Sequence, residues 1–483
     1  MIWSFFILII WTSLLYQFST FPDYTAGELY DHFLAWFENG TLYTSMDHPP
    51  YRVLNYPPLF FIFTLGIHKI GFSILSSGRI VTILFFILGN WILFWWIRGL
   101  GVRGAALGIV ALLGTSFPVF YNVGQWSLQW PAVTLSLLGL YFIQKSVVLV
   151  QAGTSQVHSG DSRQKHSGIT LFLGAFFCAL ACFVKQTQIV ASLIGFFWLF
   201  KYHRSKSFLF LLILLFTGSI GSLLLQFYFG NEIWRQMIAY TVGTFSFQEL
   251  FKQLAFHVLP WILFFLLGLW IGFKNQEERK DLRWWYFIGT SISLLSSARL
   301  GAGHQYFLEW TVATLLWVGP WIANRIHRTD YKVLTAVSCQ LSAILLLLQI
   351  FLADMGVAAI LFHHLRKLER TEKQLPQICS SLGEAEVIPS GDPGLIRACR
   401  KIPALHPFII TNLANKKLWD QTPFLKEVSQ GKYPSILLSF DLEKEIQGVH
   451  RERWTKEMIQ AMRKNYQIKK EIGEWKIYQW KKS

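Results

Sequence analysis

Long apolar blocks alternate with short polar segments along the first three quarters of the chain. Most blocks have about 15 to 23 residues, the length that crosses a hydrocarbon core of about 30 Å as a helix. Because a bilayer offers no water to the backbone, helices are the expected form of these blocks. We therefore predict about eleven spanning helices, near residues 1–19, 78–97, 104–121, 127–144, 168–184, 187–200, 207–229, 257–273, 284–298, 305–323 and 333–354.

Two apolar blocks need a separate interpretation. Residues 2–19 have the length of a signal peptide, but no basic region precedes them and no small-x-small cleavage site follows, so we interpret them as an uncleaved first span. The run Leu59–Ile67 extends only about 13 Å as a helix, and His68 and Lys69 follow it at once. We expect this run to lie at the membrane interface, held there by its aromatic residues.

The composition agrees with a membrane protein. Of the 483 residues, 53% are hydrophobic and only 15% are charged, against roughly a quarter in soluble domains. The formal charge is +16, but many lysines and arginines lie in short loops between apolar blocks, which is the pattern that sets membrane orientation. The charge therefore indicates topology and gives no reason to expect a nucleic-acid partner.

The basic residues also indicate which loops are cytoplasmic. With Met1 inside, the inner loops carry more Lys and Arg than the longer outer segments do. The inner basic residues are Arg98, Arg103, Lys145, Arg163, Lys165, Lys201, Arg204, Lys206, Lys274, Arg279, Lys280, Arg283, Arg325, Arg328 and Lys332. An odd number of spans then places the C-terminal part outside the cytoplasm.

The composition changes near residue 363 to that of a soluble domain. We divide the chain into an α-helical polytopic membrane domain, residues 1–362, and a small extracytoplasmic α/β domain, residues 363–483. In the second domain we expect buried strands at Phe408–Ile410 and Ile436–Ser439, a helix at Lys456–Asn465 and a terminal strand at Trp475–Trp480.

The chain has five cysteines. Cys178, Cys182 and Cys339 lie in predicted spans, where they are expected as small apolar residues. Cys379 and Cys399 belong to the domain predicted to be exported. In an oxidising compartment these two can form a disulfide if the fold brings their sulfur atoms together.

The first outer segment, residues 20–77, contains an amphipathic pattern. Apolar and aromatic residues recur at helical spacing over residues 26–38, and Asn39-Gly40 is a typical helix end. We predict a helix lying on the membrane surface, with Asp31 and His32 on its solvated face.

Polar and ionisable residues gather at the outer ends of the predicted spans. Such groups are costly within or beside a membrane, and are therefore functional candidates. They are Asp23, Glu28, Asp31, His32, Gln125, Gln129, Lys185, Arg299, His304 and Glu309.

Several of these residues have two explanations that the sequence leaves open. Lys185, at the tip of a predicted helical hairpin, either extends toward water or binds a phosphate. Glu309 either pairs with Arg299 or His304, or takes part in chemistry. Asp23 directly follows the first span, where a carboxylate can act as a general base on a hydroxyl or amine. Capping the helix that follows is compatible with that role.

Several short motifs follow one another in a definite order. After Asp23, the amphipathic pattern ends in Glu38-Asn39-Gly40-Thr41-Leu42-Tyr43, and Asn55-Tyr56-Pro57-Pro58-Leu59-Phe60 leads into the next apolar stretch. Gly124-Gln125-Trp126-Ser127, Lys185-Gln186 and the segment from Arg299 to Glu309 follow. This order, over most of the membrane part, resembles the C-superfamily glycosyltransferases. Among them it is most similar to the bacterial family-39-like enzymes, which include protein O-mannosyltransferases and the lipid A aminoarabinose transferase.

The resemblance implies an enzyme of the bacterial plasma membrane that transfers a sugar from an undecaprenyl- or dolichyl-phosphate donor, with inversion, on the outer face. The expected acceptor is a lipid, a glycan or a protein. Asp23 is then the expected base, since it stands where the family has a carboxylate after the first span. For the donor phosphate we expect the cations Lys185 and Arg299, with His304 as a helper. Further substrate-binding candidates are Glu28, Tyr56, Gln125 and Glu309.

The chain departs from the family pattern at two places. Relatives often have a second acidic residue directly after the first Asp, where this chain has Tyr24. They also often have an Asp in the loop after the third span, where this chain has Gln125 and Gln129. These departures put metal use in doubt, so we expect no required cofactor and see no indication of a divalent metal.

Two other classes of protein also have many spans. A transporter or flippase of lipid-linked sugars is expected to show internal repeats and helices broken at the midplane, neither of which is clear here. A scaffold protein would account for the C-terminal domain but does not require ionisable residues at one membrane face. The glycosyltransferase is therefore the interpretation that accounts for most features.

Overall fold

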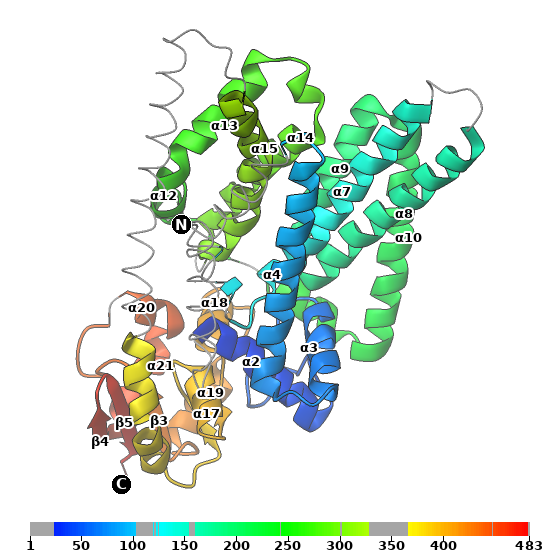
Figure 1. Cartoon of the computed structure of the whole chain (residues 1–483). Coiled ribbons are helices and arrows are strands. Elements are labelled where there is room, and N and C mark those ends of the chain that lie inside the picture. The colour runs from blue at the N-terminus through cyan, green and yellow to red at the C-terminus, as the bar shows by residue number, and fades with distance from the viewer. Residues whose placement is uncertain are drawn as a thin grey trace.

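The computed structural model describes residues 24–102, 119, 122–123, 125–153, 160–241, 243–299, 302–327, 366–446 and 448–481. It is a bundle of helices joined at one end to a small domain with a sheet (Figure 1). The predicted spans near 1–19 and 333–354, most of that near 104–121, and Asp23 and Cys339 lie outside the described residues.

Helices make up the membrane part. Their bounds are α2 Tyr24–Asn39, α3 Leu59–Lys69, α4 Ile74–Arg98, α7 Gln129–Gly153, α8 Gly160–Val184, α9 Ile189–Tyr202, α10 Arg204–Phe229, α11 Glu232–Trp234, α12 Phe247–His257, α13 Ile262–Lys274, α14 Leu282–Ser293 and α15 Phe307–His327. Short helical turns join several of them, at Gln186–Gln188 (η1), Arg235–Ala239 (η2), Leu259–Trp261 (η3), Glu278–Lys280 (η4), Leu294–Ala298 (η5) and His304–Tyr306 (η6).

Of the described helices, four are long and apolar enough to cross a membrane, namely α4, α7, α8 and α10. The pair α12 and η3–α13, bent by 42°, adds a fifth if it is one span. The predicted spans near 187–200, 284–298 and 305–323 are helical, but α9 and α14 are too short, and α15, with 21 residues, does not reach the hydropathy of the other four. The 14 residues of α9, for example, extend only about 21 Å. The predicted number of eleven spans is therefore not confirmed.

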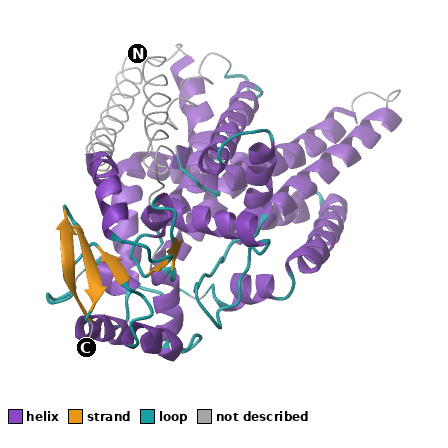
Figure 2. Ribbon diagram, turned by 90° about the horizontal axis from the view of Figure 1, so that it is seen from below, coloured by secondary structure: helices purple, strands orange, loops and turns teal. Residues whose placement is uncertain are grey.

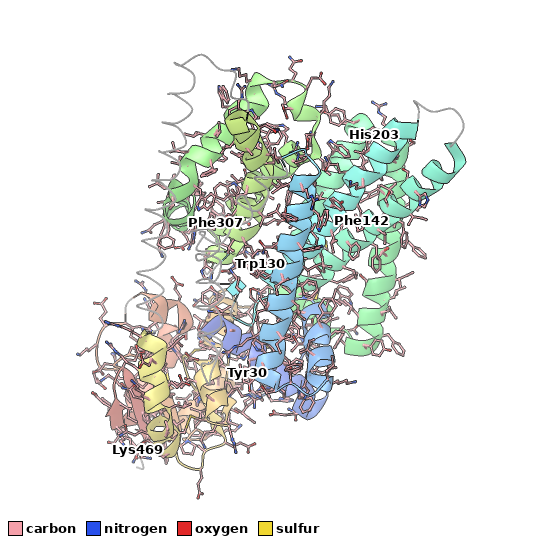
Figure 3. The ribbon with its side chains drawn as sticks, in the orientation of Figure 1. Tyr30, Trp130, Phe142, His203, Phe307 and Lys469 are labelled. Atoms are coloured by element: carbon pink, nitrogen blue, oxygen red, sulfur yellow. A yellow bond between two sulfur atoms is a disulfide. The ribbon has the colours of Figure 1, made fainter. Side chains whose placement is uncertain are left out.

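The helices differ in how much of their surface other helices cover. In α7, 67% of the apolar window is buried, whereas in α10 only 6% is. Trp130 of α7 lies inside the bundle and Phe307 begins α15 (Figure 3). Because α10 exposes Leu212, Phe216 and Leu223, its outer face is suited to contact with lipid.

Two elements of the outer segment form as the sequence predicts. Helix α2 ends at Asn39, and Gly40 takes a left-handed conformation with φ 73°, which glycine adopts without steric cost. Helix α3 has 11 residues and buries Phe60 and Phe61. One prediction about α2 is wrong: Asp31 and His32 are buried, with exposed fractions of 0% and 2%, and do not form a solvated face.

The C-terminal domain places a small sheet at one end of the molecule (Figure 2). Strands β3 Ser435–Leu438, β5 Trp475–Trp480 and β4 Tyr466–Ile472 form an antiparallel sheet in the order β3-β5-β4. A separate parallel pair joins β1 Val387–Ile388 to β2 Ile402–Pro403. Residues 366–381 of this domain are helical, and further helices are α17 Pro393–Ala398, α18 Pro407–Asn415, α19 Thr422–Ser429, α20 Val449–Arg453 and α21 Lys456–Asn465.

Most predicted elements of this domain are present, and one is wrong. The helix at Lys456–Asn465 and the strand at Trp475–Trp480 have the predicted bounds, and β3 covers most of the predicted strand at Ile436–Ser439. The run Phe408–Ile410, predicted as a strand, instead belongs to α18. Pro407 stands at the first helical position of α18, where its fixed φ favours a helix start.

The outer segment and the C-terminal domain are joined through their backbones. Tyr51 N donates to Ala404 O at 2.8 Å, and His406 N donates to Tyr51 O at 3.1 Å. Helices α2 and α17 also approach closely, since a Cβ atom on Gly27 would lie 2.6 Å from Gly394 N. The domain therefore packs directly on the end of the helix bundle that carries α2 and Tyr51.

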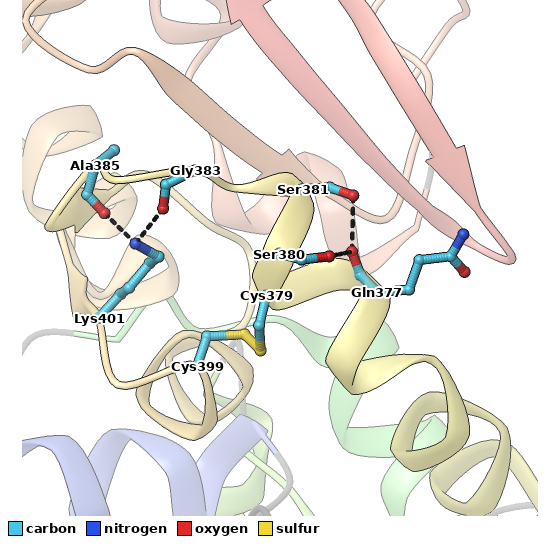
Figure 4. The surroundings of a disulfide bond; sticks show 8 residues. All are labelled: Gln377, Cys379, Ser380, Ser381, Gly383, Ala385, Cys399 and Lys401. Atoms are coloured by element: carbon cyan, nitrogen blue, oxygen red, sulfur yellow. Dashed lines mark hydrogen bonds between the residues drawn. A yellow bond between two sulfur atoms is a disulfide. The ribbon is translucent and has the colours of Figure 1, made fainter.

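Cys379 and Cys399 form a disulfide (Figure 4). Their Cα atoms are 5.1 Å apart, within the usual range for such bonds. The two cysteines are 20 residues apart in the sequence. The bond links Cys399, which directly follows α17, to the helical residues 366–381 that carry Cys379.

We expect Cys379 and Cys399 to resist alkylation under denaturing conditions until a reductant is added. Reduction should then lower the free energy of unfolding by about 2–4 kcal/mol, because it frees a closed loop in the unfolded chain. Mass spectrometry of the alkylated protein and chemical denaturation measure the two effects. Cys178, which is free, is the internal control that alkylates without reductant, and alkylation of Cys379 and Cys399 under the same conditions contradicts the bond in the native protein.

Candidate functional site

A cavity of about 320 Å³ lies between one end of the helix bundle and the C-terminal domain. Helix α2, the loop 53–56 and the turn after α8 form part of its wall. Tyr240, Thr241, Gly243 and the residues around η6 form another part, and α18 and α20 of the C-terminal domain close it. The cavity thus joins segments from both ends of the sequence.

Four of the predicted site residues line this cavity, namely Glu28, Tyr56, Lys185 and Arg299. Asp23 lies outside the described residues, but the next residue, Tyr24, is in the cavity wall. Three predicted residues do not line it, namely Gln125, His304 and Glu309.

The three residues away from the wall have other surroundings. Gln125 is buried, and the ring of His304 lies 6.4 Å from that of His257. Glu309 accepts a hydrogen bond from Tyr286 Oη at 3.2 Å. The hydrogen bond that the structure shows for Glu309 thus comes from Tyr286 of α14.

Lys185 is a buried cation in the cavity wall, at the junction of α8 and η1. Helix α8 ends at Val184, and Lys185 takes an extended conformation before η1. Its Nζ donates to Gln129 Oε1 at 2.8 Å and lies 4.8 Å from the centre of the Tyr306 ring. Burial lowers the pKa of Lys185 to about 8, although the negative charge of Glu309 opposes this shift. With an exposed fraction of 4%, Lys185 does not extend into water.

Arg299 and Tyr56 form the adjoining part of the wall. The Arg299 guanidinium donates to Thr241 O, and its backbone pairs with Phe245. Burial raises the pKa of Tyr56, and Tyr306 and Glu28 add to this rise while Arg299 opposes it. Tyr56 therefore lies within electrostatic range of both Arg299 and Glu28.

The loop that carries Tyr56 is fixed on both sides. Gln186 Nε2 donates to Asn55 O at 2.7 Å, and Tyr43 Oη donates to Tyr56 O at 2.7 Å. Gln236 adds two bonds, accepting from Leu54 N at 2.8 Å and donating to Thr44 O. These bonds connect the loop to the same turn that positions Lys185.

Glu28 lies at the end of the cavity that faces the C-terminal domain. Its Oε1 accepts a hydrogen bond from Tyr24 Oη at 2.7 Å, and Tyr24 Oη accepts from Phe408 N at 3.2 Å. The Arg453 guanidinium lies 3.7 Å from the centre of the Tyr24 ring. Burial raises the pKa of Glu28, while His406, Tyr24 and Arg453 act in the opposite direction.

The cavity therefore has cations and carboxylates at different places along its wall. Lys185 and Arg299 can hold an anionic group such as a phosphate. Glu28 can accept a proton or a hydrogen bond from a polar group. Among the described residues there is no group of three His, Cys, Asp or Glu side chains that could hold a metal ion.

The sequence analysis missed the contribution of the C-terminal domain to this cavity. Arg453 and Asn412 line it, yet they lie far along the chain from Glu28 and belong to no recognised motif. Long-range pairing of this kind leaves no periodic signal in a single sequence, so no local pattern identifies them.

Comparison with known proteins finds similarity in structure alone. No family model matches the chain, and no curated protein matches it. The crystal structure of ArnT from Cupriavidus metallidurans bound to undecaprenyl phosphate is similar with a TM-score of 0.60 and 12% identity, over 98% of each chain. The structure of ArnT in the apo state gives a TM-score of 0.58 at 12% identity, over 98% of this chain and 97% of that one.

An archaeal protein is also similar. The oligosaccharyltransferase AglB from Archaeoglobus fulgidus, in complex with an inhibitory peptide and a dolichol-phosphate, gives a TM-score of 0.59 at 10% identity. The match covers 96% of this chain and 72% of that chain. The chain therefore shares its fold with ArnT and AglB, both of which are C-superfamily glycosyltransferases. The resemblance seen in the motif order is thus confirmed at the level of the fold.

Proposed function

We propose that this protein is a membrane glycosyltransferase that moves a sugar from a polyprenyl-phosphate donor to an acceptor. The proposal rests on one observation: the buried Lys185 lines the same cavity as Glu28, the carboxylate on helix α2. The fold adds support, because a protein of the same fold, ArnT, has been crystallised with undecaprenyl phosphate.

The proposed reaction is a single displacement at the anomeric carbon. The bond between that carbon and the donor phosphate breaks, and the phosphate keeps the electron pair while Lys185 and Arg299 stabilise its charge. The acceptor oxygen or nitrogen forms the new bond from the opposite face and gives its proton to a carboxylate. We assign Asp23 as this base, and Glu28 as a carboxylate that orients the acceptor.

We propose that the reaction takes place on the outer face of the bacterial plasma membrane. The excess of basic residues in the predicted inner loops supports this orientation. The Cys379–Cys399 disulfide gives independent support, because such bonds persist in oxidising compartments. The acceptor is a lipid, a glycan or a protein, and the proposed mechanism requires no metal.

The proposal is tested by reconstituting the purified full chain in vesicles that contain radiolabelled polyprenyl-phosphate sugars extracted from bacterial membranes. We expect the label to leave the polyprenyl fraction and to appear in a lipid, glycan or protein fraction when bacterial envelope material is added. Movement of intact labelled lipid to the other leaflet without cleavage would contradict the proposal and favour a flippase.

A further inference from the structure

A buried ionic cluster surrounds Asp31 and takes no part in the proposed reaction. Asp31 lies on α2 one helical turn after Glu28, but it does not line the cavity. Its side chain is fully buried, and three side chains donate to it. They come from three different segments, namely Arg52 in the outer loop, Arg397 in α17 and His406 before α18.

The contacts within the cluster use both carboxylate oxygens. Arg52 Nε lies 2.6 Å from Oδ2 and Arg52 Nη2 lies 3.1 Å from Oδ1. His406 Nε2 lies 2.8 Å from Oδ2, and Arg397 Nε bonds to Oδ1. Arg397 also reaches Glu38 at the end of α2, at 3.3 Å. The C-terminal domain therefore contacts α2 at two charged positions.

The electrostatics of the cluster keep Asp31 ionised. Burial alone raises the pKa of a carboxyl group, but Arg52, His406 and Arg397 together hold the pKa of Asp31 well below its usual range. A buried charge is costly unless it is paired and hydrogen-bonded. The cluster is thus stable only when the outer loop, α2 and the C-terminal domain are in their present positions.

Two further contacts fix α2 against the same domain. Gly27 packs on Gly394 without room for a side chain, and Tyr24 Oη accepts from Phe408 N. Tyr24 and Gly27 precede Glu28 in the sequence and Asp31 follows it, so α2 contacts the C-terminal domain on both sides of Glu28. Glu28 itself is bonded to Tyr24, so its position depends on this docking.

We infer that Asp31 is a positioning residue, which fixes α2 on the C-terminal domain so that Glu28 and Arg453 face the same cavity. The C-terminal domain is then a part of the transfer site. Asp31 acts through α2 and touches no substrate. A displacement of about 1 Å in a catalytic group can lower a rate by about 10²-fold, so a loosened α2 should reduce turnover strongly.

The inference is tested with Asp31→Asn, which preserves the shape of the side chain and removes its charge. We expect turnover at saturating donor and subsaturating acceptor to fall by about tenfold or more, and the affinity for undecaprenyl phosphate to change by less than about twofold. That affinity depends on Lys185 and Arg299, which do not contact the cluster. Hydrogen exchange should become faster in α2 and remain unchanged in α7.

Two more variants make the result interpretable. Arg397→Gln leaves the contacts of Asp31 with Arg52 and His406 in place, so it should give the same pattern with a smaller loss of turnover. It replaces Asp31→Asn as the test if that variant does not fold. Lys367→Gln removes the exposed ion pair with Glu474 and is the matched control, for which no change is expected.

The turnover measurement rests on the proposed function, but different outcomes would contradict the positioning role of Asp31 and the proposed function itself. Normal turnover in Asp31→Asn, or an equal loss of donor affinity and turnover in both cluster variants, would overturn the positioning role. If the wild-type protein itself transfers no sugar, the proposed function fails. Hydrogen exchange in α2 would still decide whether Asp31 holds this helix.

Discussion

Replacing Asp23 with Asn is expected to lower turnover by about 10² to 10⁴, the usual contribution of a general base. Asp23 directly precedes α2, whose first residue, Tyr24, lines the cavity. Asn keeps the size of the side chain but cannot accept the acceptor proton. Initial rates with a polyprenyl-phosphate sugar measure turnover, and the affinity for undecaprenyl phosphate should remain within about twofold if the loss lies in the chemical step.

Two other carboxylates serve as comparisons for Asp23. Asp47 is exposed in the same outer segment, so Asp47→Asn should leave the rate unchanged. Glu28→Gln should raise the KM for the acceptor more than it lowers kcat, because Glu28 is proposed to orient the acceptor. Full activity of Asp23→Asn together with an inactive Glu28→Gln would transfer the role of base to Glu28.

Local patterns in the sequence predicted local structure well. The helical spacing and the Asn39-Gly40 pair define α2, because a helix end depends on residues that are neighbours in the chain. Lys185 was predicted at a hairpin tip for a similar reason, since two apolar blocks flank it. These features need no knowledge of distant contacts.

Predictions that depend on distant segments were less successful. Helical periodicity predicted that Asp31 and His32 lie on the solvated face of α2, because it could not show that other parts of the fold bury these residues. Two partners of Asp31, Arg397 and His406, are 366 and 375 residues away. The same reason explains why Arg453 was missed, since only the fold brings α20 to Tyr24.

The predicted spans show a different limitation. Counting apolar blocks assumes that each block crosses the bilayer as one straight helix, whereas α12 and η3–α13 are bent by 42° and α14 has only 12 residues. Hydropathy locates α13 and α14 near the predicted spans, but it does not predict α12, which precedes the predicted span near 257–273. It does not give their path through a membrane, because short helices can be buried against their neighbours.

Replacing Lys185 with Ala is expected to weaken binding of undecaprenyl phosphate by about 10- to 100-fold, which corresponds to a charge-assisted hydrogen bond of about 1.5–3 kcal/mol. Lys185 Nζ donates to Gln129 and lies over the Tyr306 ring, and these contacts fix the ammonium group in the cavity wall. Isothermal titration in detergent measures the affinity. Lys69→Ala removes an exposed lysine at the end of α3 and is the control for a general loss of positive charge.

The pH dependence of this affinity gives a second, independent test of Lys185. Because burial lowers its pKa to about 8, Lys185 is charged below pH 8 and loses its proton as the pH rises above that value. A phosphate monoester, with its second pKa near about 6, already carries its charge there. Affinity for undecaprenyl phosphate should therefore fall progressively between about pH 8 and 10 in the wild-type protein. Lys185→Arg should remove that fall, because the guanidinium stays protonated throughout this range. The same pH dependence in Lys185→Ala as in the wild type would assign the titration to another group and would leave Lys185 without a role in phosphate binding.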